Sequence, residues 1–205
     1  MNFSAVILAG GKSSRMGCDK AFLEIGGQTL LARQIQLVHD AGAAEVFISG
    51  REGVDYSTSG CRVLTDKFPD AGPLAGIERA LDTMTSPLLL VLAVDLPAMT
   101  AEFLQKLTES SSENCGIVPL VNGNLEPLAA IYPKAALPIA TVLLNQNSFA
   151  VKDFAARCEP ATLVSFIDLP ATAAQLFLNC NSPGDLDSVQ SQIGRRLPLS
   201  KTPTR

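Results

Sequence analysis

A short segment near the N-terminus carries the residues best suited to chemistry. The apolar residues 5–8 predict a buried strand, and they lead directly into the glycine-rich, basic sequence LAGGKSSRMGCDK at positions 8–20. Glycine lets the backbone approach a ligand closely and adopt positive φ, and exposed N–H groups in such a turn bind anions. Three cations lie within ten residues of Gly10, namely Lys12, Arg15 and Lys20. The segment therefore predicts a nucleoside triphosphate site.

The spacing of this loop excludes two common phosphate-binding motifs. It lacks the G-x-x-x-x-G-K-[ST] pattern of a P-loop, and it lacks the G-x-G-x-x-G pattern of a dinucleotide-binding loop. A surface loop with solvated basic side chains is the alternative interpretation. The coincidence of a preceding strand, a glycine pair and spaced cations favours a binding site, because loops on a rigid scaffold often carry function.

A carboxylate much further along the chain is the second candidate. Residues 88–94 are all apolar and predict a central strand, and Asp95 follows it directly. A carboxylate in this position is costly unless it is exposed or paired. Magnesium prefers oxygen ligands, usually one or two carboxylates together with phosphate oxygens. Asp95 is therefore predicted to bind Mg²⁺, and a role in a turn or helix cap is the alternative.

The elements that must position these residues alternate between strand and helix. The expected strands are residues 4–8, 46–49, 62–65, 88–94, 116–119, 127–132, 163–167 and 177–179. The expected helices are residues 29–41, 74–84, 100–110, 134–144 and 150–157, with a last helix opening at Ser182 and Pro183. Such alternation predicts an α/β fold of three αβα layers around a mostly parallel, Rossmann-like sheet.

This fold class also predicts where a ligand binds. Ligands of such sheets lie beyond the carboxyl ends of the strands, so the first loop, the region of Asp66 and Asp95 should converge on one cleft. Asn122 and Gly123 predict a hairpin turn between strands 116–119 and 127–132. We expect one domain over residues 1–194, followed by a basic, frayed tail over residues 195–205.

Composition excludes several classes of protein. The net charge of −4 and the absence of tryptophan argue against a nucleic-acid binder. Five scattered cysteines without a C-x-x-C pair, and a single histidine, argue against a zinc site and suit reduced thiols in the cytoplasm. The N-terminus has no signal-peptide pattern, and the apolar stretch at residues 87–98 is too short to span a bilayer.

The first segment, from Leu8 to Lys20, resembles the signature of the molybdenum cofactor guanylyltransferases. Four further segments similar to this family follow in order: residues 72–77 (GPLAGI), 95–97 (DLP), 126–128 (EPL) and 179–183 (NCNSP). The resemblance thus covers nearly the whole chain. It implies a nucleotidyltransferase with a glycosyltransferase-A-like fold that transfers GMP from GTP to molybdenum-loaded molybdopterin, with Mg²⁺ as cofactor and pyrophosphate as the second product.

The resemblance also implies roles for individual residues. The predicted catalytic residues are Lys20, Asp95 and Arg15. The predicted nucleotide-binding residues are Leu8, Ala9, Gly10, Gly11, Lys20, Asp66, Gly72 and Asp95. The predicted acceptor-binding residues are Arg15, Glu126, Asn179 and Asn181. Asp66 would accept hydrogen bonds from guanine N–H groups or ribose hydroxyls, with Asp70 as its competitor, and a turn before the last helix is the alternative role of the asparagines.

One position departs from the family pattern, and two other functions remain as alternatives. Some family members carry an asparagine at the exit of the second strand, where this chain has Ile48, Ser49 and Gly50. A cytidylyltransferase acting on the same pterin, or another small nucleotidyltransferase, is the enzyme alternative. Its loop usually reads L-A-A-G, whereas this chain has Gly10 followed by Gly11, which leaves room for a purine. A non-catalytic carrier of nucleotide or pterin is the other alternative.

The family also implies partners. Handover of an unstable cofactor predicts transient contacts with a molybdenum-inserting protein upstream and with apo-molybdoenzymes downstream. No nucleic acid and no membrane is expected as a partner.

Overall fold

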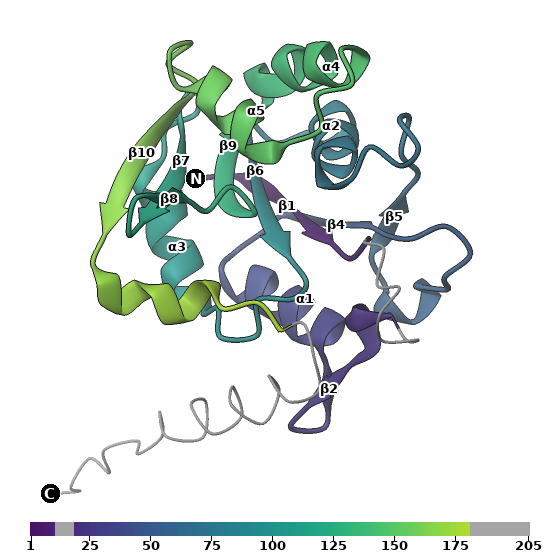
Figure 1. Cartoon of the computed structure of the whole chain (residues 1–205). Helices are drawn as coiled ribbons and strands as arrows, with labels where there is room; N and C mark the ends of the chain where they lie inside the picture. Colours follow the sequence, from purple (N-terminus) through teal and green to yellow (C-terminus); the bar gives the residue numbers. More distant parts are fainter. Residues whose placement is uncertain (11–18, 181–205) are drawn as a thin grey trace, which may run out of the picture.

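The computed structural model describes residues 1–10 and 19–180, and it is built around a five-stranded sheet (Figure 1). The strand order is β5-β4-β1-β6-β9. The first four strands run parallel, and β9 is antiparallel to β6. The bounds are β1 Phe3–Leu8, β4 Glu45–Ser49, β5 Arg62–Leu64, β6 Leu88–Ala93 and β9 Ala129–Pro133. The predicted α/β class with a mostly parallel sheet is confirmed.

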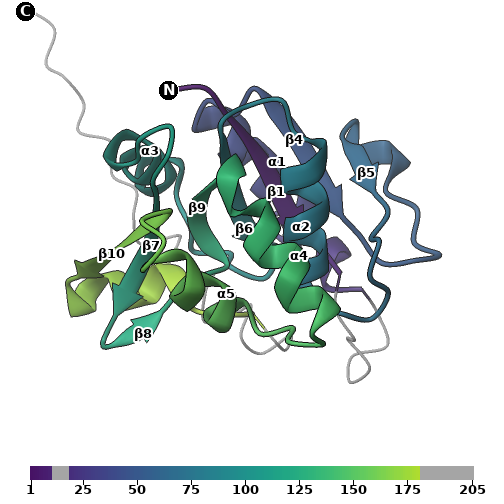
Figure 2. The ribbon, with the colours of Figure 1, turned by 90° about the horizontal axis from the view of Figure 1, so that it is seen from above.

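Helices cover both faces of this sheet, which gives three layers (Figure 2). One face packs against α1 (Leu30–Asp40) and α3 (Ala101–Ser110). The other packs against α2 (Pro73–Thr83), α4 (Leu137–Asn145) and α5 (Val151–Cys158). Every residue of β1 and β6 is buried. Their apolar runs follow from this position, because a strand covered by helices on both faces has no polar side.

The helices begin where the local sequence favours it. Thr29 caps α1 by accepting a hydrogen bond from Ala32 N–H at 3.1 Å, and Thr100 caps α3 in the same way. Pro73 occupies the first turn of α2, directly after Gly72, whose φ of 70° and ψ of −158° are open essentially to glycine alone. These starts agree with the predicted helices to within one residue.

A smaller sheet has the strand order β10-β7-β8. Its pairing differs from the predicted hairpin between residues 116–119 and 127–132. Its strands are β7 Gly116–Val121, β8 Asn124–Leu125 and β10 Val164–Leu169. Asn122 and Gly123 do form a turn of positive φ, but it pairs β7 with the two-residue β8. The predicted partner strand, now β9, instead pairs with β6. An apolar run indicates that a strand is buried but does not show which strand it pairs with. β9 is fully buried, which fits its place in the larger sheet between two layers of helices.

The predicted strand at residues 177–179 is wrong. Ala171–Phe177 forms the 3₁₀ helix η4, and Leu178 and Asn179 are exposed and belong to no strand. The Phe177 ring packs edge-on against Phe103, with centroids 5.6 Å apart. Three residues are too few for periodicity to separate a strand from a helical turn. The predicted helix at Ser182 and the tail at 195–205 lie outside the described residues.

The remaining elements are short. They are η1 Lys20–Phe22, β2 Glu24–Ile25, β3 Gln28–Thr29, η2 Ser57–Ser59 and η3 Lys134–Ala136. β2 and β3 form a hairpin through a turn at Gly26 and Gly27, both of positive φ. Within the part of the chain that the structure describes, no helix has the length and apolar character needed to cross a membrane. The domain bounds stay a prediction.

Candidate active site

Lys20 and Asp95 meet at the carboxyl ends of the central strands. Lys20 Nζ lies 3.2 Å from Asp95 Oδ2, and both side chains are about one-quarter exposed, at 23% and 24%. They line a hollow of about 190 Å³ whose walls are Leu8, Ala9, Gly10, Asp19, Lys20, Pro73, Ala93, Val94, Asp95 and Leu128. The structure therefore brings together the ends of β1 and β6 with the residue that closes the predicted signature.

Lys20 is held in place by the residue before it. Asp19 Oδ1 accepts the Ala21 N–H at 3.0 Å and so caps the 3₁₀ helix η1. Its other oxygen, Oδ2, accepts the hydroxyl of Tyr56 at 3.3 Å. The Tyr56 ring is buried, which raises the pKa of its hydroxyl, and it stacks on Phe22 with centroids 5.8 Å apart. Both carboxylate oxygens of Asp19 are thus engaged, and the backbone at Lys20 is fixed from two sides.

The turn that carries Asp95 contacts the C-terminal part of the described chain. Cys180 N–H donates to the Asp95 carbonyl at 2.9 Å. Asn179 therefore lies next to a residue hydrogen-bonded to the Asp95 backbone, and its own side chain is exposed. Asn181, Arg15 and Gly11 lie outside the described residues. As far as residue 180, the segment that carries Asn179 thus reaches the turn of Asp95.

A larger groove adjoins the hollow, since Leu8, Gly10 and Pro73 line both. Its volume is about 1060 Å³, at the upper end of what ligand sites occupy. At this groove the Ser49 carbonyl accepts hydrogen bonds from the N–H groups of Ala9 at 2.9 Å and Gly10 at 3.0 Å, which joins the ends of β1 and β4. The other lining residues are Ser49, Gly50, Arg51, Glu52, Gly53, Val63, Leu64, Thr65, Asp66, Pro69, Asp70 and Gly72.

Asp66 is the acidic residue of this groove with an unusual environment. Its side chain is half-buried, and Oδ1 is fully buried without a hydrogen-bond partner among the described residues. Burial raises the pKa of the Asp66 carboxyl, the nearby Glu78 carboxylate raises it further, and Arg79 opposes them. An acceptor left unsatisfied in a groove is costly unless a ligand supplies the donor. Asp70 lines the same groove and is exposed.

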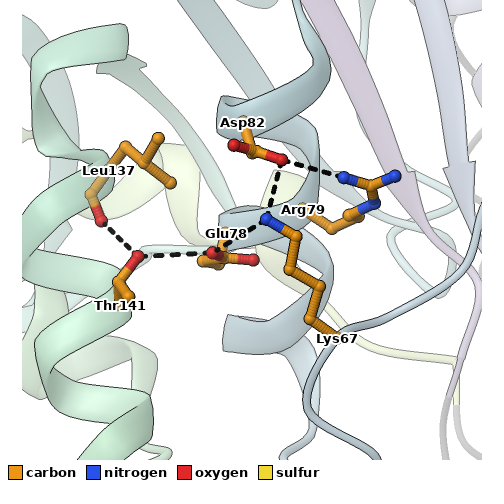
Figure 3. A network of polar contacts seen from close by, with 6 residues as sticks. All are labelled: Lys67, Glu78, Arg79, Asp82, Leu137 and Thr141. Atoms are coloured by element: carbon orange, nitrogen blue, oxygen red, sulfur yellow. Dashed lines mark hydrogen bonds and ion pairs between the residues drawn. The ribbon is translucent and has the colours of Figure 1, made fainter.

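The residue after Asp66 anchors this loop to α2 (Figure 3). Lys67 Nζ lies 2.8 Å from Asp82 Oδ2 and 3.9 Å from Glu78 Oε1. Glu78 is 3% exposed and also accepts the Thr141 hydroxyl from α4 at 3.3 Å. Arg79 contributes a second cation to Asp82, at 2.8 Å. The network joins the groove loop to two helices, so it fixes the backbone beside Asp66.

Glu126 is not among the residues that line the hollow or the groove. It is half-buried, which raises its carboxyl pKa, while the charge of Lys152 opposes that shift. Of the predicted 126–128 segment, it is Leu128 that lines the hollow, and its carbonyl accepts the Ala93 N–H at 2.8 Å. The 126–128 segment therefore contacts the site through Leu128 and its backbone.

Several groove residues were not predicted from the sequence. Arg51, Glu52 and Gly53 follow β4, so the rule that ligands gather beyond strand ends could have indicated them. Tyr56 gave no signal of its own. A Cβ atom at Gly50 would lie 2.3 Å from Tyr56 Cε2, so the ring occupies the space of a side chain at position 50. This packing leaves no room for a larger side chain at position 50.

With this geometry established, comparison with known proteins identifies the family. The family described as "MobA-like NTP transferase domain" matches residues 5–176. The chain belongs to this family.

Curated relatives match this chain over nearly their whole length. A "Probable molybdenum cofactor guanylyltransferase" of Opitutus terrae is 35% identical over 187 residues, which cover 90% of this chain and 93% of the relative. A "Molybdenum cofactor guanylyltransferase" of Xanthomonas euvesicatoria is 32% identical over 189 residues, which cover 88% and 90%. As a MobA-like NTP transferase, the chain is a nucleotidyltransferase of molybdenum cofactor biosynthesis.

Solved structures show the same fold. Molybdopterin-guanine dinucleotide biosynthesis protein A from Archaeoglobus fulgidus superposes with a TM-score of 0.72 at 19% identity, covering 94% of this chain and 99% of that one. A 2-C-methyl-D-erythritol 4-phosphate cytidylyltransferase from Thermus thermophilus gives 0.72 at 20% identity, covering 95% and 100%. The fold is thus shared by nucleotidyltransferases whose names give different substrates.

Proposed function

We propose that this MobA-like transferase moves GMP from GTP to the terminal phosphate of molybdenum-loaded molybdopterin. The observation that carries the proposal is the Lys20–Asp95 pair in a small hollow that adjoins the groove of Asp66 and Gly72. A cation and a carboxylate beside a glycine-rich turn suit a triphosphate. A long groove with an unsatisfied buried carboxylate oxygen suits a base that presents N–H groups. The names of the relatives support guanine and molybdopterin as substrates.

The groove would hold the nucleoside. The Asp66 carboxylate would accept from the guanine N–H groups or from ribose hydroxyls, and this would satisfy its buried Oδ1. Gly72 at positive φ, Gly10 and Gly11 would let the backbone approach the nucleotide closely because glycine places no Cβ in the way. The backbone of Leu8 and Ala9 would lie beside them.

The reaction would need little proton transfer. An oxygen of the acceptor phosphate bonds to the α-phosphorus of GTP, and the bond from that phosphorus to the pyrophosphate oxygen breaks. The acceptor phosphate is already ionised, so no strong general base is required. Lys20 would neutralise negative charge on the departing pyrophosphate, and alignment of the two phosphates would supply much of the remaining rate.

The residues present fit a magnesium ion at Asp95. Its carboxylate is partly exposed at the end of β6 and opens into the hollow, and Mg²⁺ usually binds through one or two carboxylates plus substrate phosphates. Asp95 would be its protein ligand. The bound ion would supply charge screening and polarisation of the phosphorus.

The acceptor would bind on the side of the 179–181 segment. Asn179, one residue before the Cys180 contact with Asp95, and Asn181 would hydrogen-bond the pterin, and Arg15 would clamp its phosphate. Glu126, beside the Leu128 wall, would orient the same substrate. A cytoplasmic location and transient contacts with a molybdenum-inserting protein and apo-molybdoenzymes belong to the same proposal.

A nucleotide comparison tests the proposal. Pyrophosphate release is measured with Mg²⁺, molybdenum-loaded molybdopterin and each of GTP, CTP, ATP and UTP. We expect release with GTP and a guanine dinucleotide as the product. A preference for CTP would establish a cytidylyltransferase instead. Nucleotide binding without pyrophosphate, with the authentic acceptor present, would establish a carrier.

A further inference from the structure

A glutamine occupies the buried face of α1, where an apolar residue is expected. The buried residues of this helix are Leu30, Leu31, Gln34 and Val38, and Gln34 is 0% exposed. Burying an amide side chain costs free energy unless its polar atoms find partners. A polar residue in this position therefore requires a specific reason.

The reason lies in the turn that carries Asp95. Gln34 Nε2 donates to the Leu96 carbonyl at 2.8 Å and lies 3.4 Å from the Val94 carbonyl. Its one amide group thus contacts the carbonyls on both sides of Asp95. The orientation of the amide is fixed by chemistry, because an oxygen in place of Nε2 would face two acceptors.

Neighbouring contacts complete the set of carbonyl acceptors in this turn. Arg33 Nε, also on α1, donates to the Pro97 carbonyl at 2.9 Å. Cys180 N–H donates to the Asp95 carbonyl at 2.9 Å. Every carbonyl from residue 94 to residue 97 therefore accepts a hydrogen bond from outside the turn. The backbone is satisfied without the Asp95 carboxylate, which remains available to Lys20 and the hollow.

This arrangement leaves one polar atom of the Gln34 amide without a hydrogen bond. Its Oε1 is buried with no hydrogen-bond partner among the described residues. An unpaired buried acceptor lowers stability, so the side chain is not optimised for stability alone. A feature that costs stability next to a site residue indicates that the position of the turn matters for function.

We propose that Gln34, assisted by Arg33, is a positioning residue for Asp95. Its amide holds the turn at residues 94–97 so that the Asp95 carboxylate stays beside Lys20, where the nucleotide-bound metal would meet it. This inference rests on the proposed function only for the role it gives to that carboxylate.

The test replaces Gln34 by Met, which keeps the length of the side chain and removes its donors. Amide hydrogen exchange is followed at Met99, whose N–H donates to the Leu96 carbonyl, and at Cys180. We expect exchange at both to accelerate about tenfold. Mn²⁺ affinity in the presence of GTP, measured by electron paramagnetic resonance, should fall about five- to tenfold. The kcat should fall about tenfold, while the KM for GTP stays within about twofold.

Gln36→Met is the matched control. Gln36 lies on the same helix, is exposed, and hydrogen-bonds only Asp40 in the described residues, at 2.7 Å. It should leave exchange, metal affinity and kcat unchanged. A purely structural role for Gln34 would instead lower the unfolding midpoint without changing Mn²⁺ affinity or kcat at a permissive temperature, and that result would overturn the proposal.

Arg33→Met keeps the proposal testable if Gln34→Met does not fold. Arg33 is only half-buried, and its loss should accelerate exchange at the turn and weaken Mn²⁺ binding to a smaller degree. Unchanged exchange and affinity in this variant would contradict the proposal. If wild-type protein binds no GTP, the proposed function fails, and the exchange data still decide whether α1 holds the turn.

Discussion

Lys20 Nζ contacts Asp95 Oδ2 at 3.2 Å, although the two residues are 75 positions apart. Each side chain is only about one-quarter exposed, so each partly desolvated charge has its counter-charge before any substrate is present. Both groups would have to contact phosphates or metal when GTP binds. Under the proposed function, the pair would be a preorganised resting state whose members separate or share a ligand during turnover.

Removing either charge should abolish turnover. We expect Lys20→Ala and Asp95→Ala each to lower kcat/KM for GTP by more than about a hundredfold, as loss of a charge-stabilising group commonly does. The fold should stay intact at a cost of about 1–3 kcal/mol, because the charge left behind is only about one-quarter exposed. Steady-state pyrophosphate release and urea unfolding measure the two effects.

The exposed pair of Lys106 and Glu102 on α3, at 2.7 Å, offers a matched control. Lys106→Ala removes a cation of the same type from an ion pair that lines neither cavity. Its activity should equal that of the wild type. Near-normal activity in Lys20→Ala or Asp95→Ala would refute the assignment of that residue.

The sequence was sufficient to place these residues at one edge of the sheet. Apolar runs ending in Gly10 and Asp95 indicated parallel strands with chemistry at their carboxyl ends. It was not sufficient for β9, because burial on both faces does not specify which strand is the neighbour. Contacts such as Tyr56 with Asp19 and Gln34 with Leu96 also escaped prediction, since they depend on how loops and helices pack across long sequence distances.

Asp66→Asn should change nucleotide specificity. A carboxylate accepts from guanine N1–H and the 2-amino group, whereas an amide also donates and suits the 2-carbonyl of xanthine. We expect kcat/KM for GTP to fall about tenfold or more and that for XTP to rise, since unpaired polar groups in a buried site cost that much. Equal losses for GTP and XTP would instead indicate that Asp66 contacts the ribose.

The same residue should produce a pH dependence. Burial and Glu78 raise the Asp66 pKa above its ordinary 3.8, and the neutral acid cannot accept two hydrogen bonds from guanine. The KM for GTP should therefore rise as pH falls from 7 toward the raised pKa, and Asp66→Asn should flatten that profile. An identical acid limb in both proteins would show that another group titrates.

The raised pKa of Asp66 also makes the stability of the fold depend on pH. The folded chain favours the protonated form of Asp66, so its contribution becomes less favourable as pH rises from 3.8 through the folded pKa. Asp66→Asn removes this penalty and should raise the Tm of the ligand-free protein at pH 7. Differential scanning calorimetry at pH 7 measures the change, and a lower Tm would contradict the environment described for Asp66.

Lys67→Met should weaken nucleotide binding more than catalysis. It leaves the buried Glu78 without its nearest lysine and releases the loop of Asp66 from Asp82. We expect the KM for GTP to rise about three- to tenfold, with kcat within about twofold, because only the position of the base-binding loop changes. Thr141→Val, which removes the hydroxyl donor to Glu78 from α4, should act in the same direction but more weakly. A fall in kcat at unchanged KM would contradict this role.

Gly50 and Tyr56 should be energetically coupled. A Cβ at Gly50 would lie 2.3 Å from Tyr56 Cε2, and the ring cannot move away easily because its hydroxyl bonds Asp19 and accepts the Arg51 N–H. Gly50→Ala should therefore destabilise the fold by about 1–3 kcal/mol, as overpacking does. It should also lower kcat, since a displaced Tyr56 releases Asp19 next to Lys20.

A double-mutant cycle in urea unfolding measures this coupling. In a Tyr56→Ala background the space beside position 50 is empty, so adding Gly50→Ala should cost almost nothing further. The expected interaction energy is about 1–3 kcal/mol, the full cost of Gly50→Ala alone, and lies within the range for residues in contact. Additive losses would mean that the Tyr56 ring does not restrict the side chain at position 50.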